Sequence, residues 1–182
     1  TVNADKADYQ KQESGKAESQ FEMVKKLELS WSEFNDIRKE CINSGILFCS
    51  TAFDSASIDF LQGMAIPFWK LPSGEITNLP YIRYVTRLGK PVLLSTGMAN
   101  LGEIEAAIDA IELAGTPRDK ISVMHCTTEY PTPMEDVKLR AMVNIGNALG
   151  VKVGYSDHTS GIEIPIAAVA LGATVIEKHF TL

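Results

Sequence analysis

The 182-residue sequence has few cysteines, and their arrangement excludes the simplest metal site. Only Cys41, Cys49 and Cys126 are present, and no two of them have the CxxC spacing of a zinc ribbon. An odd number of cysteines placed in helix-like and strand-like segments is typical of reduced thiols rather than of a disulfide framework. We therefore expect a cytoplasmic protein.

Long apolar runs and an excess of basic residues are also lacking. The apolar stretch 164–169 is far too short to span a bilayer. The 17 Lys and Arg against 23 Asp and Glu give a net charge of −6, which argues against a general nucleic-acid surface but allows a local anion site. No GxGxxG or Walker pattern follows a strand-like segment. We therefore expect no membrane, nucleic-acid or ordinary nucleotide partner.

Strand-like and helix-like patterns alternate along most of the chain. Six short apolar runs are predicted to be strands: 46–50, 68–71, 91–95, 121–126, 151–155 and 174–180. Periodic helical patterns precede or separate them: 19–29, 30–45, 57–63, 79–88, 100–115, 137–149 and 162–171. Strict alternation predicts a parallel sheet, either open and doubly wound or part of an eight-stranded barrel. Polar residues end nearly every strand, which favours the α/β barrel, because a barrel builds its site from all of its loops.

Each of the three histidines follows a predicted strand. His158 and His179 come after neighbouring strands, so both imidazoles should emerge at the carboxyl edge of the sheet, and His125 follows an earlier strand in the same way. Two neutral imidazoles suit a divalent transition metal and leave positions for water and substrate. The alternative is that they are ordinary core residues. Asp157 is compatible with a metal ligand, an outer partner of a ligand, or a structural cap.

The segment 70–75 has the composition of an anion site. Lys70 at a strand end either reaches solvent or meets an anion, and Ser73 with Gly74 offers a hydroxyl and accessible backbone N–H groups. Glu75 adds a carboxylate that can bind sugar hydroxyls or transfer a proton. A plain turn with a surface lysine, or a Schiff-base Lys70, are the alternatives.

Further hydroxyl residues lie at other predicted strand ends. Thr51, Ser95 and Thr127 are each compatible with a cap or turn, but together they suit a polyanionic ligand. Tyr130 can pack against a sugar ring. Neighbours on a strand alternate, so Lys178 should point away from His179 and is expected to be structural.

Five motifs in order resemble the N-acetylneuraminate (sialic acid) synthase family, including the legionaminic acid synthases. They are Lys70-Leu71-Pro72-Ser73-Gly74-Glu75, Ser95-Thr96-Gly97-Met98, His125-Cys126-Thr127-Thr128-Glu129-Tyr130-Pro131, Ser156-Asp157-His158 and Glu177-Lys178-His179-Phe180-Thr181. The resemblance implies a (β/α)8 barrel that condenses phosphoenolpyruvate with an N-acetylmannosamine-type sugar. The products would be a nonulosonic acid and phosphate.

The resemblance also implies roles for individual residues. A divalent metal, Mn²⁺ with Mg²⁺ or Co²⁺ as alternatives, would be held by His158 and His179, which with Glu75 form the expected catalytic set. Phosphoenolpyruvate would be bound by five residues: Lys70, Ser73, Ser156, Thr51 and Ser95. The sugar would contact Glu75 and Tyr130. Thr127 stands where some members have asparagine, so that contact is open.

The resemblance finally implies that the chain is part of a longer protein. It lacks an initiator methionine, and by count residues 1–182 form a single partial barrel domain with strands three to eight. Two earlier strands, with a glutamate and a lysine of the site, and a C-terminal antifreeze-like domain would lie outside it. An arginine of that domain reaches the partner's sugar, so the full-length protein is expected to be a homodimer. Two alternatives remain, a Schiff-base aldolase using Lys70 and a non-catalytic sugar-phosphate-binding barrel.

Overall fold

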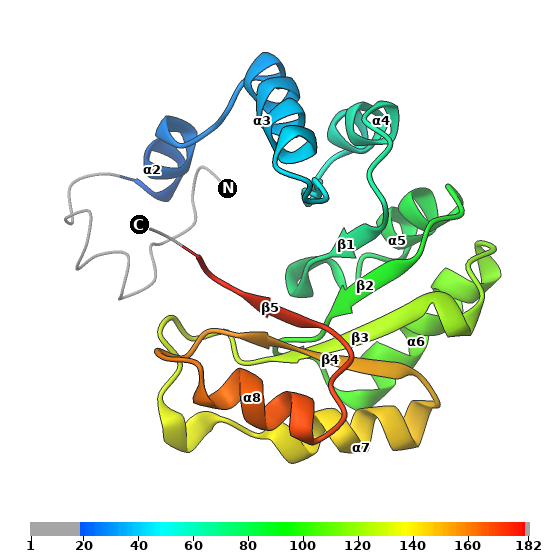
Figure 1. Cartoon of the computed structure of the whole chain (residues 1–182). Helices are drawn as coiled ribbons and strands as arrows, with labels where there is room; N and C mark the ends of the chain where they lie inside the picture. Colours follow the sequence, from blue (N-terminus) through cyan, green and yellow to red (C-terminus); the bar gives the residue numbers. More distant parts are fainter. Residues whose placement is uncertain (1–18, 181–182) are drawn as a thin grey trace. The chain divides into compact units, whose positions relative to one another are not determined.

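The computed structural model describes residues 19–180, which form two compact units with a boundary between Ile46 and Leu47 (Figure 1). The first unit contains helices α2 (Gln20–Lys26) and α3 (Trp31–Asn43). Each begins with a capping box, in which Ser19 pairs with Glu22 and Ser30 with Glu33. The sequence predicts a single partial barrel domain, and this stays a prediction.

The second unit alternates strands and helices, as the apolar patterns predict. Its elements in chain order are α4 (Ser55–Gly63), β1 (Trp69–Leu71), η1 (Ser73–Glu75), α5 (Leu79–Thr86), β2 (Val92–Ser95), α6 (Leu101–Leu113), η2 (Arg118–Lys120), β3 (Ile121–Cys126), η3 (Met134–Asp136), α7 (Leu139–Leu149), β4 (Lys152–Asp157), α8 (Glu163–Ala170) and β5 (Ile176–Lys178). None of the helices formed by residues 19–180 is both long and apolar enough to cross a membrane.

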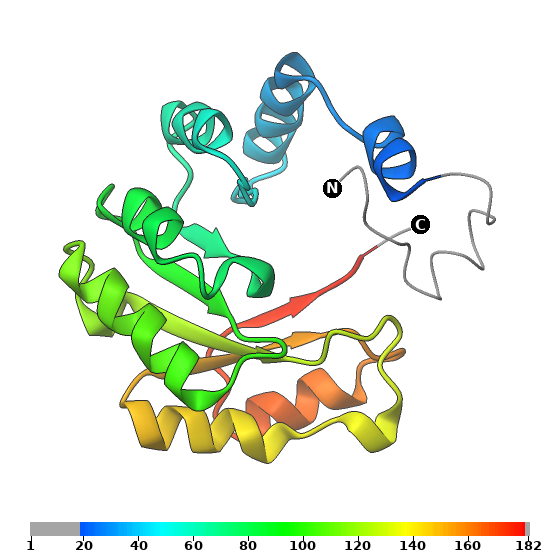
Figure 2. The same cartoon turned by 180° about the vertical axis from the view of Figure 1, so that it is seen from behind.

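The five strands form one parallel sheet in the order β1-β2-β3-β4-β5. Every neighbouring pair is parallel and consecutive in the chain, which is the connectivity of a (β/α) barrel rather than of a doubly wound sheet with a switch point. Helices α6, α7 and α8 lie along one face of the sheet (Figures 1 and 2). The fold is therefore an incomplete α/β barrel.

One predicted strand is not formed. Residues 46–50 are irregular, so the described chain has five strands where the sequence predicts six. A strand requires a backbone ladder, and here the contact recorded with the neighbouring segment is the Cys49 thiol to the Phe68 carbonyl, 3.8 Å apart. The backbone N–H of Trp69 bonds instead to Pro91, on the β2 side. An apolar run alone therefore overpredicts a strand at a sheet edge.

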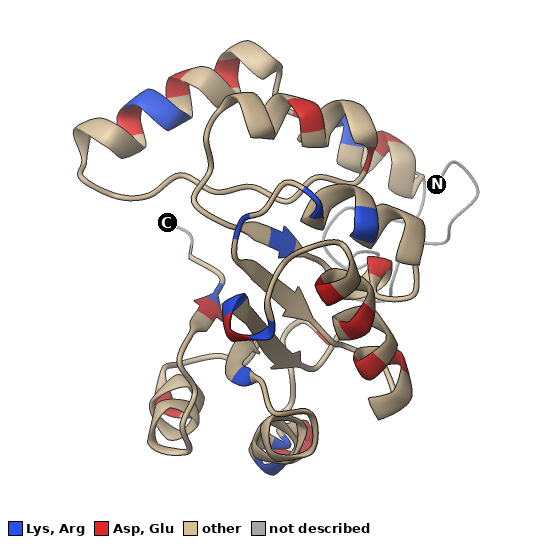
Figure 3. Ribbon diagram, turned by 90° about the vertical axis from the view of Figure 1, so that its right-hand side faces the viewer, with Lys and Arg blue, Asp and Glu red and all other residues tan. Residues whose placement is uncertain are grey.

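The core lies between the sheet and its helices. Val92 and Leu94 of β2 pack with apolar residues of the helices, and Met142, Tyr155 and Ala168 form a fully buried cluster between α7, β4 and α8. Charged residues lie mainly on the helices and loops (Figure 3), and β2 and β3 contain none. Among the five strands, charged side chains therefore occur on β1, β4 and β5.

Candidate active site

The interior face of the sheet gathers three polar side chains from β1, β4 and β5. Lys70 of β1 donates to Glu177 of β5 with Nζ and Oε2 2.5 Å apart, and Ser156 of β4 donates to the other carboxylate oxygen at 2.6 Å. Lys70 and Glu177 belong to the two outermost strands of the sheet. The sheet therefore curves enough for its outer strands to meet across the interior.

The Lys70–Glu177 pair is partly open to a cavity. The side chain of Lys70 is 12% exposed and that of Glu177 42% exposed. A cavity of about 370 Å³ is lined by both residues and by Ser50 and Thr51. The predicted substrate residue Thr51 thus lies with Lys70, although it follows an irregular segment rather than a strand.

The charge on Glu177 is maintained despite its burial. Burial raises the pKa of this carboxyl, but hydrogen bonds from Lys70 and Ser156 outweigh it, and the net pKa is lowered. Glu177 was not singled out as a site residue from the sequence. The period-two alternation that places Lys178 on the opposite face also places Glu177 on the face of His179, and this signal would have found it.

The two predicted metal ligands lie together at the carboxyl edge. The ring centroids of His158 and His179 are 5.4 Å apart, and the ring of Tyr130 lies 4.1 Å from His158 and 5.5 Å from His179. The Nδ1 atom of His158 lies 2.6 Å from the Thr127 carbonyl, and Nε2 lies 3.4 Å from the Ser156 hydroxyl. If Nδ1 is protonated, Nε2 presents its lone pair, as a metal-binding imidazole requires.

The imidazole of His158 is biased toward its neutral form. Burial lowers the pKa of His158, the hydrogen bond to Thr127 partly opposes this, and the nearby His179 lowers it further. Neutral imidazole is the form that binds a metal. Within residues 19–180, however, no group of three or more His, Cys, Asp or Glu side chains is close enough to hold an ion without other ligands.

Two predicted phosphate-binding hydroxyls lie at the ends of β1 and β2. Ser73 in η1 accepts a hydrogen bond from the N–H of Gly97, 2.8 Å away. Ser95 is buried, and its hydroxyl oxygen has no partner among the described atoms. A buried hydroxyl without a partner is costly, so Ser95 is available to a ligand or a water molecule.

Two other predicted site residues make contacts within the protein, while their predicted contacts with substrate stay predictions. The carboxylate of Glu75 accepts a hydrogen bond from Asn78 at 2.7 Å, beside the start of α5, and the structure records no contact between it and the histidines. Thr127 contributes its main-chain carbonyl to His158, as described above, rather than its hydroxyl. Main-chain contacts of this kind carry no side-chain signal in a sequence.

Asp157 and Lys178 form a second ion pair, and Lys178 also lines the cavity described above. Lys178 Nζ lies 2.5 Å from Asp157 and 2.8 Å from the Thr159 carbonyl, while Asp157 also accepts from the Thr159 hydroxyl at 2.8 Å. These contacts are compatible with the structural role predicted for Lys178, while its orientation relative to His179 stays a prediction. Of the three alternatives for Asp157, the geometry favours a structural anchor.

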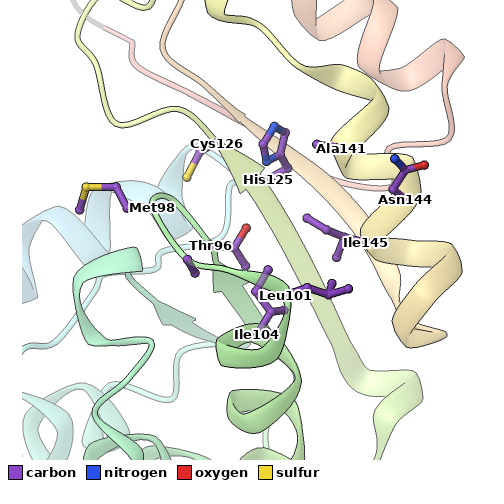
Figure 4. A pocket seen from close by; sticks show the side chains of 10 residues that line it. Thr96, Met98, Leu101, Ile104, His125, Cys126, Ala141, Asn144 and Ile145 are labelled. Carbon is purple, nitrogen blue, oxygen red and sulfur yellow. The ribbon is translucent and has the colours of Figure 1, made fainter.

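His125 lies apart from the other two histidines. The side chains of His125 and Cys126 leave β3 in opposite directions (Figure 4), and His125 lines a pocket of about 330 Å³ with residues of α6 and α7. Its Nε2 atom is buried without a recorded partner. Burial lowers its pKa, partly offset by a hydrogen bond to the backbone of Lys138. All three histidines therefore lie at strand ends, but His125 lies on a different face of the sheet from His158 and His179.

Comparison with known proteins identifies a single family. A family model described as the NeuB family matches residues 1–182. The chain is 50% identical to the N,N'-diacetyllegionaminic acid synthase of Campylobacter jejuni, covering 100% of this chain and 54% of that protein. It is 45% identical to the enzyme of the same name from Legionella pneumophila, covering 98% of this chain and 51% of that protein. The chain thus spans about half the length of these relatives.

Solved structures agree with the fold. The N-acetylneuraminic acid synthetase of Leptospira borgpetersenii, crystallised with citrate, superimposes with a TM-score of 0.84 at 32% identity, covering 94% of this chain and 59% of that chain. A DAHP synthase from Thermotoga maritima superimposes with a TM-score of 0.69 at 19% identity, covering 81% of this chain and 46% of that chain, which shows a shared fold alone.

Proposed function

Because this chain belongs to the NeuB family, we propose that the full-length protein condenses phosphoenolpyruvate with an open-chain 2-acetamido sugar. The products are a nonulosonic acid and inorganic phosphate. The observation that carries this proposal is the convergence of Lys70, Ser156 and Glu177 beside His158 and His179 at one edge of the sheet. That edge is where barrel enzymes build their sites.

The cavity side chains suit a ligand with two anionic groups. The ammonium of Lys70 and the hydroxyls of Ser73, Ser95 and Ser156 provide one cation and several neutral donors, which is the chemistry needed for a phosphate and a carboxylate. On binding, the ligand would share the Lys70 ammonium with Glu177. The Glu177 carboxylate, held by Ser156, would then be available to accept a proton during addition of water.

The two imidazoles fit a divalent metal ion as part of the site. His158 is held at Nδ1 by the Thr127 carbonyl, so its other nitrogen can coordinate, and His179 lies beside it. The remaining ligands would come from water, substrate or other protein groups. When bound, a metal such as Mn²⁺, or Mg²⁺ or Co²⁺, supplies a Lewis acid for the aldehyde oxygen of the sugar. Tyr130 would pack against the sugar.

The Schiff-base alternative is not favoured by the geometry. A Schiff-base lysine attacks through the lone pair of a neutral amine. Lys70 instead donates to Glu177 at 2.5 Å, and an ammonium group in an ion pair has no free lone pair. The non-catalytic alternative lacks a supporting observation, because polar side chains at the strand ends meet around one cavity.

The names of the relatives narrow the choice of sugar substrate. The two proteins at 50% and 45% identity are both named for a product with two N-acetyl groups. We therefore propose a sugar with two acetamido groups rather than N-acetylmannosamine itself.

The decisive experiment follows phosphoenolpyruvate that carries ¹⁸O in its bridging oxygen. The full-length protein is incubated with this compound, Mn²⁺, and sugars with one or two acetamido groups. The proposed reaction breaks the C–O bond, so the label must appear in inorganic phosphate, together with a sugar-dependent acid detected by mass spectrometry. Label retained in the organic product, or phosphate release that does not depend on sugar, would contradict the proposal.

The metal is tested separately. Full-length protein is stripped with EDTA and reconstituted with Mn²⁺, Mg²⁺ or Co²⁺, and metal content is measured for wild type, His158→Ala and His179→Ala. We expect both variants to lose the metal and turnover while keeping the wild-type fold. Unchanged metal content in either variant would exclude it as a ligand.

The assembly of the full-length protein stays a proposal drawn from the resemblance. We propose a homodimer, in which the partner supplies part of the sugar site, and a cytoplasmic location. Light scattering measures the oligomeric state, and cell fractionation tests the location.

A further inference from the structure

The loop after β2 fixes the hydroxyl of Ser73 from one side. Gly97 is buried in this loop, and its N–H donates to Ser73 Oγ at 2.8 Å. A hydroxyl has two acceptor lone pairs and one proton. Because the amide occupies a lone pair, the proton of Ser73 must point elsewhere.

Cys126 contacts the same hydroxyl from β3. Its sulfur lies 3.4 Å from Ser73 Oγ. A thiol is a weak hydrogen-bond partner. An anionic oxygen forms a much stronger hydrogen bond with a hydroxyl than sulfur does. The Ser73 O–H can therefore turn from the sulfur to a ligand at little cost.

The space around Gly97 admits no side chain. A Cβ atom at this position would lie 2.5 Å from Thr128 Cγ2, 3.0 Å from Ser73 Oγ and 3.1 Å from Cys126 Sγ. Gly97 does not adopt the left-handed backbone conformation, unlike its neighbour Met98 at φ 64°. Glycine is therefore required here for close approach rather than for conformation.

From these three contacts we propose that Gly97 and Cys126 are positioning residues for Ser73. The amide of Gly97 sets the rotamer of the hydroxyl, and the weak contact with Cys126 leaves the Ser73 O–H able to donate a hydrogen bond to an anionic oxygen of phosphoenolpyruvate. This inference rests on the proposed function and deepens it, because it identifies how three neighbouring strand ends organise one donor for the anion.

The test measures phosphoenolpyruvate binding to the full-length protein by calorimetry, without sugar, and then the KM of each substrate. Gly97→Ala is expected to weaken phosphoenolpyruvate binding about 10-fold, the scale of one hydrogen bond, with the sugar KM nearly unchanged. Cys126→Ala should act in the same direction more weakly, and Cys126→Ser, which restores a polar partner, should bind more tightly than Cys126→Ala.

Double mutants separate positioning from a general packing defect. If Gly97 and Cys126 act through Ser73, then each substitution should have little further effect in a Ser73→Ala background. Thr128→Ser removes the methyl group nearest to the new Cβ. Combined with Gly97→Ala it should relieve the packing clash, measured by thermal unfolding, without restoring phosphoenolpyruvate affinity.

The outcomes distinguish this inference from the proposed function. Equal phosphoenolpyruvate affinity in wild type and Gly97→Ala, additive effects with Ser73→Ala, or full rescue by Thr128→Ser would overturn the inference alone. Binding by wild type without condensation would overturn the proposed function alone. Failure of phosphoenolpyruvate to bind wild type would overturn both.

Discussion

Strand β5 carries two lysine–carboxylate pairs that have the same length and opposite surroundings. The Lys70–Glu177 and Lys178–Asp157 pairs both measure 2.5 Å. Glu177 is 42% exposed and borders a cavity, whereas Asp157 is 0% exposed and is further bonded by Thr159. Lys70 and Lys178 both line this cavity, so the two pairs differ in their carboxylates: a ligand can reach Glu177, whereas Asp157 is buried. Ion-pair length therefore does not distinguish a functional pair from a structural one, but access does.

The largest loss of stability should come from removing the buried carboxylate of the Lys178–Asp157 pair. Asp157→Ala leaves Lys178, which is 28% exposed, with the Thr159 carbonyl as its recorded partner. Removing one member of a buried pair costs about 3–5 kcal/mol. Chemical denaturation of the full-length protein should show this loss in the free energy of unfolding. Glu105→Ala on the exposed face of α6 is the control, with a change below about 0.5 kcal/mol. If Asp157→Ala were as stable as wild type, the structural role assigned to Asp157 would be wrong.

The Lys70–Glu177 pair, whose carboxylate is exposed, should show the opposite pattern: a large loss of ligand binding and little loss of stability. Lys70→Met removes a charged donor from the cavity and should weaken phosphoenolpyruvate binding about 10- to 100-fold, the range for a hydrogen bond to a charged group. Because Glu177 keeps Ser156 and reaches solvent, unfolding should change little. Lys178→Met is the matched control and should lose stability while the folded fraction binds normally. If both lysine variants lost binding equally, the two pairs would not be functionally distinct.

Single hydroxyls test the same contrast on a smaller scale. Thr159→Val removes the hydroxyl that donates to buried Asp157 but keeps the backbone N–H that donates to the same oxygen at 3.1 Å. We expect a loss of about 1.5 kcal/mol in the free energy of unfolding. Ser156→Ala should lose less stability and more phosphoenolpyruvate affinity. Urea titrations and calorimetry on both variants decide this, and a reversed order of stabilities would count against the comparison.

The smallest effect concerns His125, which lies on the helix-covered face. Burial lowers its pKa below the ordinary histidine value of about 6.5, so the folded state binds a proton less readily than the unfolded state. Its contribution to stability is therefore complete above pH 6.5 and is lost as the pH falls below that value toward the folded pKa. In His125→Asn, the unfolding free energy should depend less on pH between 7.5 and 5.5 than in wild type. Identical slopes would mean that His125 titrates normally.

Much of the fold can be predicted from residue patterns, because alternation of apolar runs and helices dictates a parallel sheet. Short apolar runs are predicted to be strands, and β1 to β5 confirm this rule. The rule fails at residues 46–50, where an apolar run lacks a backbone partner on the strand ladder. Local patterns report burial, but they do not report which neighbours complete a sheet.

The site is less predictable than the fold, for a physical reason. The histidine pair could be found from strand-end positions alone. The bond between Lys70 and Glu177 depends on curvature of the whole sheet, and the bond between His158 and Thr127 uses a main-chain atom. Glu75 bonds locally to Asn78, and its predicted contact with sugar stays a prediction. Side-chain identity fixes the available chemistry, whereas curvature and backbone geometry decide which groups meet.

The pairing of Lys70 with Glu177 also bears on the order of folding. The two residues are 107 positions apart, and the strands that carry them are connected through β2, β3 and β4. Closing so long a loop directly is entropically unfavourable, so each strand added between them brings the two groups nearer. The pair should therefore form only after the intervening sheet has assembled. A partly folded chain would have most of its helices but no anion site, and ligand binding would report the completion of folding.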